Sequence, residues 1–106
     1  MTIRYKNAKI DLTTTNATAV LTPDNATTAV IKSILVSEDS GNADTITLTI
    51  TAGSDVFSLF NVKAVSANGT VELLSAPLVL AESEILKATA ATANRLHVVV
   101  SFMEIS

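Results

Sequence analysis

The sequence contains no cysteine and no tryptophan, and its 106 residues include only three glycines, two prolines, one tyrosine and one histidine. Without cysteine, neither a disulfide nor a thiolate metal site can form, and folding in a reducing cytoplasm is compatible with this composition. Three glycines are too few for a phosphate-cradling loop. The single histidine, His97, cannot by itself supply a nucleophile triad or a zinc site. We therefore expect no enzymatic activity, no cofactor and no metal.

Charged residues are also scarce. They make up 16% of the chain, against about 25–35% on the surface of a typical small soluble domain, while hydrophobic residues make up 48%. No apolar run approaches the roughly 20 residues of a membrane span, and the net charge of −3 argues against a nucleic-acid partner. A surface so poor in charge is typical of a subunit covered by protein partners. The alternative is a monomeric β-domain.

Strict alternation of threonine with apolar residues gives the clearest strand prediction. In residues 45–52, the sequence places Ile46, Leu48 and Ile50 on one face and threonines on the other. Shorter patterns, separated by turn signals such as Asn68-Gly69, predict the remaining strands. These lie at residues 17–22, 26–37, 55–65, 71–74, 78–80, 84–90 and 95–105.

The fold predicted from these segments is all-β, an antiparallel β-sandwich or jelly roll of seven or eight strands. Residues 26–37 and 95–105 carry apolar residues at both odd- and even-numbered positions. This pattern indicates central strands or strands covered on both faces. The alanine content of residues 81–94 is compatible with a helix, but Thr89 and Thr92 favour a strand. Residues 16–106 form the predicted sandwich domain. Residues 1–15 form an extended N-terminal arm or first strand.

Two acidic segments are candidate sites. Carboxylate and amide oxygens of Glu38, Asp39, Asn42 and Asp44 could surround a calcium ion, although a solvated acidic loop explains the same residues. Glu82 and Glu84 form a second acidic pair. With one tyrosine and three phenylalanines the chain has no aromatic platform for a sugar, so we interpret this pair as a polar strand entry rather than a catalytic dyad.

Four pieces of the chain carry a resemblance to a known class of proteins. They are VIKSILVS at residues 30–37 with the alternating strand at 45–51, Phe60-Asn61-Val62 before the Asn-Gly turn, the segments 72–80 and 85–90, and LHVVVSFMEI at 96–105. Together they cover roughly residues 26–106. This part of the sequence resembles small β-sandwich virion proteins of tailed bacteriophages.

The resemblance implies a capsid-decorating, or cement, protein, often a homotrimer at capsid three-fold positions. Its partners would be further copies of itself and the major capsid protein or another virion protein, and its location would be the capsid surface. A neck, tail or fibre component is the first alternative, and a host-surface or carbohydrate-binding sandwich the second. Arg4, Tyr5, Lys6 and Lys9 are the candidate partner-binding residues, and a solvated strand edge is the simpler interpretation of the same cluster.

Overall fold

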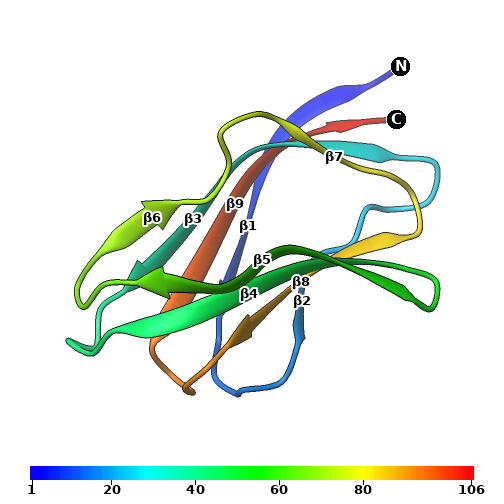
Figure 1. Cartoon of the computed structure of the whole chain (residues 1–106). Coiled ribbons are helices and arrows are strands. Elements are labelled where there is room, and N and C mark those ends of the chain that lie inside the picture. Colours follow the sequence, from blue (N-terminus) through cyan, green and yellow to red (C-terminus); the bar gives the residue numbers. More distant parts are fainter.

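The computed structural model describes residues 1–106 as nine β-strands without a helix, arranged in two antiparallel sheets (Figure 1). This confirms the predicted all-β antiparallel sandwich. Nine strands are present rather than seven or eight, because the N-terminal segment forms a strand in addition to the eight segments predicted between residues 17 and 105. No helix with the length and hydrophobicity of a membrane span occurs.

Sheet A contains the first and the last strand of the chain as neighbours. Its order is β1 (Ile3–Asp11), β9 (Leu96–Ile105) and β3 (Thr28–Glu38), with β6 (Thr70–Glu72) and β7 (Leu78–Leu80) both paired to the far edge of β3. Sheet B has the order β2 (Thr18–Leu21), β8 (Glu84–Ala90), β4 (Asp44–Ala52) and β5 (Asp55–Val65). All strand pairs are antiparallel.

The core lies between the two sheets and follows the period-2 pattern of the strands. On β4 the buried apolar residues are Ile46, Leu48 and Ile50, as predicted. The other buried apolar residues come from both sheets and from Leu12 and Leu73, which follow β1 and β6. They are Ala29, Ile31, Ile34, Val36, Val65, Leu73, Leu80, Leu86, Ala88, Ala90, Leu96, Val98, Val100 and Phe102.

A β-bulge in β3 explains why its sequence is apolar at both parities. The register against β9 shifts between Ile31 and Ser33. The buried side chains are therefore odd-numbered up to Ile31 and even-numbered from Ile34 and Val36 onward. Leu35 is 39% exposed. The strand is therefore central, as predicted, but it is not covered on both faces.

The carboxylate of Glu72 closes this bulge. It accepts hydrogen bonds from the amides of Ile34 (2.8 Å) and Leu74 (3.2 Å) and from the hydroxyl of Ser33. Partial burial raises the pKa of Glu72, but these donors outweigh burial and bring the pKa below its usual range. Glu72 thus supports the point where β3 changes its partner from β7 to β6.

Val62 occupies a left-handed conformation in β5, with φ of 54°. This conformation costs a residue with a β-carbon about 1–2 kcal/mol, whereas asparagine tolerates it. We expect Val62→Asn to stabilise the domain by on the order of 0.5–1 kcal/mol, measured by chemical denaturation. Val56 is equally exposed (63% against 61%) and has no positive φ, so Val56→Asn is the control and should bring no gain. Equal effects of both changes would contradict the strain argument.

Candidate partner-binding surface

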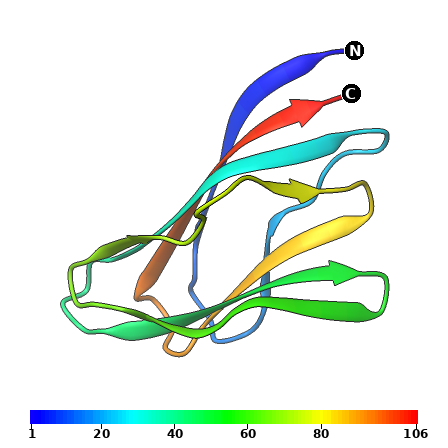
Figure 2. The same ribbon diagram turned by 45° about the horizontal axis from the view of Figure 1, so that its top comes forward.

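The N-terminal residues form a strand that is built into sheet A. β1 pairs with β9 without a register shift, from Ile3 opposite Ile105 to Asp11 opposite His97. Figure 2 shows the two strands running side by side to adjacent chain termini. The sequence left open whether this segment is an extended arm or a first strand, and in the structure it is a strand. The pairing continues without interruption through Asn7 and Ala8.

The four predicted partner-binding residues lie on opposite faces of β1, because successive side chains of a strand alternate. Tyr5 and Lys9 belong to the outer face of sheet A, and Tyr5 is 81% exposed. Arg4 and Lys6 belong to the opposite face of β1, the face of Ile10, which packs against the core. The Lys6 ammonium pairs with Glu104 at 3.2 Å. The structure therefore does not gather these four residues into one patch.

Tyr5 instead belongs to a row of apolar side chains that crosses four strands. Tyr5 lies opposite Met103, Met103 opposite Val30, and Val30 opposite Val79. Ile3 and Ile105 form a second pair on the same face. Directly opposite residues of antiparallel strands have Cβ atoms about 4.5–5.5 Å apart, so these side chains form a contiguous surface. We call this surface the outer apolar face, consisting of Ile3, Tyr5, Val30, Val79, Met103 and Ile105.

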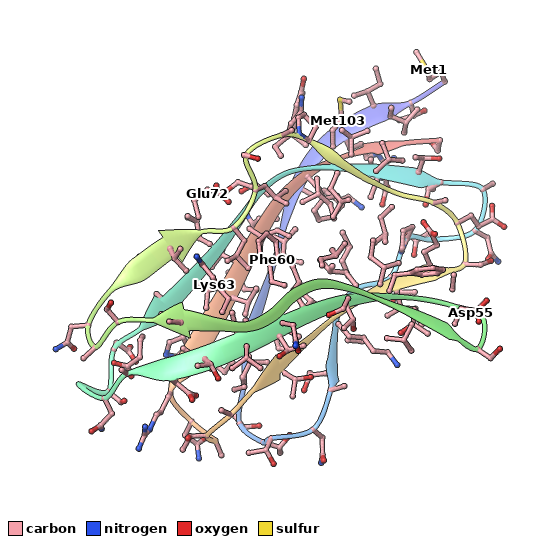
Figure 3. The ribbon with its side chains drawn as sticks, in the orientation of Figure 1. Met1, Asp55, Phe60, Lys63, Glu72 and Met103 are labelled. Carbon is pink, nitrogen blue, oxygen red and sulfur yellow. The ribbon has the colours of Figure 1, made fainter.

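The outer apolar face is accessible to solvent. Val79 is 57% exposed and Ile3 is 48% exposed, while Val30, Met103 and Ile105 are partly exposed. Met103 lies at the same end of the molecule as Met1, where the termini meet (Figure 3). No other element of the chain covers this side of sheet A (Figures 1 and 2).

Glu38, one of the calcium candidates, serves as the centre of a hydrogen-bonded loop. It is 2% exposed, and its carboxylate accepts from the Ser40 amide (2.7 Å) and hydroxyl and from the amides of Gly41, Asn42 and Asn68 (each 3.1 Å). Burial raises the pKa of Glu38, but these donors outweigh it and lower the pKa to about 2. The carboxylate thereby fixes residues 40–42 against the Asn-Gly turn.

The other acidic side chains also have separate partners. Asp44 accepts the amide of Thr92 at 3.1 Å, and Asp39 contacts His97. Because their oxygens point to different groups, no set of three or more His, Asp or Glu side chains could hold a metal. The calcium hypothesis gains no support. Glu82 and Glu84 accept the amides of Ala26 (2.6 Å) and Ala81 (2.7 Å), which fits a strand entry.

His97 connects three segments at the opposite end of β1 from the chain termini. Its Nδ1 contacts Asp11 on β1, and its Nε2 lies 3.0 Å from Asp39 in the β3–β4 loop. The hydrogen bond with Asp11 raises the pKa of His97, burial opposes the rise, and Asp39 adds to it. The sequence did not predict this arrangement, because Asp11 and Asp39 are both far from His97 along the chain.

The raised pKa of His97 predicts a pH dependence of stability. The protonated ring stabilises the fold fully below its ordinary pKa of 6.5, and this contribution is lost as the pH rises through the folded-state pKa. The side chain is 38% exposed, so we expect a loss of no more than about 1 kcal/mol. Urea denaturation at pH values below and well above 6.5 measures it. His97→Gln should remove this loss, and an unchanged pH profile in the variant would contradict the assignment.

Comparisons with known proteins do not place the chain in a family. No protein-family model matches it, and a search of curated proteins finds no match. The outer apolar face and the resemblance of the sequence are therefore the grounds for a function.

Proposed function

We propose that this protein is a non-enzymatic structural protein of a bacteriophage virion, which binds the assembled shell as a decoration, or cement, protein. The observation that carries the proposal is the outer apolar face: six apolar side chains on one side of sheet A that nothing in the chain covers. Contiguous apolar surface of this kind typically marks a site of protein association.

The rest of the surface supports a binding role rather than catalysis. The carboxylates of Glu38, Glu72 and Asp44 accept backbone amides, and that of Asp39 contacts His97, so these groups maintain the fold. Inter-strand hydrogen bonds hold a sheet face rigid, which suits it to docking against another protein surface. Because it consists of side chains that also pack with their cross-strand neighbours, it requires no rearrangement on binding.

A cement protein acts through mass action. If the chain binds the mature shell and not the loosened shell, each bound copy stabilises the mature state by RT ln(1 + [L]/Kd), where [L] is the concentration of the free protein. In this proposal the protein binds as a homotrimer around a three-fold position. Association of copies and contact with the shell would together cover the charge-poor surface.

Copy number in purified particles tests the proposal. We expect quantitative mass spectrometry to find this chain in hundreds of copies per particle, in a fixed ratio to the main shell protein. Tens of copies or fewer would favour the alternative of a neck, tail or fibre component, for which the same face would serve. Absence of the chain from purified particles would contradict any virion role.

A further inference from the structure

The free edge of β1 presents a row of unpaired backbone groups. Thr2 and Ser106 exchange both amide hydrogen bonds (2.9 and 3.0 Å), and the Leu12 amide donates to Leu96 (3.0 Å). In an antiparallel ladder the bonded positions alternate, so the even-numbered residues of β1 bond to β9. The amides and carbonyls of the odd-numbered residues face away from the sheet, at Ile3, Tyr5, Asn7, Lys9 and Asp11.

No other edge of the two sheets is so open. The pairing of β5 contains two register shifts, and its Val62 is left-handed. β2 has four residues and a register shift, and β6 and β7 have three residues each. Such short or irregular edges resist the addition of another strand. β1 is a nine-residue strand without proline or a register shift, so it can accept one.

The charges around this edge are mainly positive, although the chain carries a net charge of −3. β1 has three basic side chains, Arg4, Lys6 and Lys9, and one acidic side chain, Asp11, which contacts His97. Lys6 is paired with Glu104 of β9, whereas Arg4 and Lys9 form no ion pair within the chain.

We propose that the open edge of β1 binds an extended, acidic segment of the partner protein, which adds to sheet A as a further strand. Backbone pairing with the odd-numbered residues would hold the segment, and Arg4 and Lys9, the two basic side chains of β1 without an ion pair, would select its carboxylates. A second copy of β1 fits less well, because the basic side chains without an ion pair, Arg4 and Lys9, would meet the same two positive charges on the second copy. The inference deepens the proposed function by naming the chemistry of the partner segment.

Amide hydrogen exchange of the full-length protein tests this proposal residue by residue. The probe is a capped nine-residue peptide that alternates glutamate with valine, and the control replaces glutamate with lysine. We expect the glutamate peptide to slow exchange at the amides of Tyr5, Asn7 and Lys9 by about fivefold or more, the value of one net hydrogen bond. The amides of Lys6 and Ala8 already bond to β9, so their exchange should not change.

Reversing the charge of one exposed side chain provides the matched variant for this experiment. Lys9→Glu should weaken protection by the glutamate peptide and allow protection by the lysine peptide. Equal protection by both peptides with the original protein, or by neither, would overturn the proposal. So would slowing of the odd-numbered amides at high protein concentration without peptide, together with a doubled mass in light scattering, because the occupant would then be a second copy. Any of these failures would leave the copy-number result of the proposed function unaffected.

Discussion

Glutamine in place of Glu38 is expected to lower the melting temperature of the domain more than any other change of a single polar side chain. Each carboxylate oxygen of Glu38 accepts more than one hydrogen bond, two from Ser40 on one oxygen and three amides on the other. In either orientation of the glutamine amide, its NH₂ group would replace an oxygen that accepts hydrogen bonds. The donors on that side would then be left without an acceptor in a buried site. Thermal unfolding followed by circular dichroism measures the loss.

The control for this change is Glu82→Gln. Glu82 accepts a single amide, that of Ala26, which the oxygen of a glutamine can still accept. We expect this variant to melt close to the original protein. Equal melting temperatures for the Glu38 and Glu82 variants would contradict the central role of Glu38 in its loop.

The same residue determines how the fold responds to acid. The pKa of Glu38 falls from 4.5 to about 2 in the folded chain, so its contribution to stability is complete above pH 4.5 and is lost as the pH falls towards 2. The lowered pKa of Glu72 acts in the same direction. Glu38→Gln should therefore lose less stability than the original protein between pH 4.5 and 2.

Met103→Glu is expected to weaken binding to the shell by at least about thirtyfold, the effect of losing one interface hot spot. Met103 lies between Tyr5 and Val30 in the outer apolar face, so the change places a charge at the centre of the proposed contact. Because the side chain is outside the core, we expect the free energy of unfolding to change by no more than about 1 kcal/mol. Co-sedimentation with particles assembled without this protein measures the binding.

Val56→Glu is the matched control for that experiment. Val56 is 63% exposed and lies opposite Thr51 on sheet B, away from the outer apolar face. The Val56→Glu variant should bind particles as tightly as the original protein. Equal losses of binding in the Met103→Glu and Val56→Glu variants would contradict the assignment of the outer apolar face. Deletion of residues 1–12 is not an equivalent test, because it removes Leu12, which is fully buried, together with β1.

Local patterns predicted much of the fold. The alternation in residues 45–52 reflects a real difference between a core face and a threonine face, so β4 follows from sequence. β7 and β8 match the predicted residues 78–80 and 84–90, because turn residues bound both segments. The bulge in β3 could not be inferred, since a change of buried parity and burial on both faces produce the same apolar pattern.

The candidate surface was harder to predict because its residues come together only through strand register. Tyr5 was identified with three basic neighbours in the sequence, whereas its neighbours in space are Met103 and, beyond it, Val30. Similarly, Glu38 was considered a metal ligand, and its role depends on the amide of Asn68, thirty residues later. Sequence identified the residues, but long-range pairing determines what they contact.

Oxidative footprinting of purified particles tests most directly whether the outer apolar face is the partner-binding surface. Hydroxyl radicals modify exposed methionine and aromatic side chains, and Tyr5 and Met103 lie on this face. Phe57, which is 56% exposed on β5, serves as the internal reference. We predict that Tyr5 and Met103 are protected in particles relative to the free protein while Phe57 remains reactive. Equal modification of Tyr5 and Met103 in both states would show that the face is not the contact.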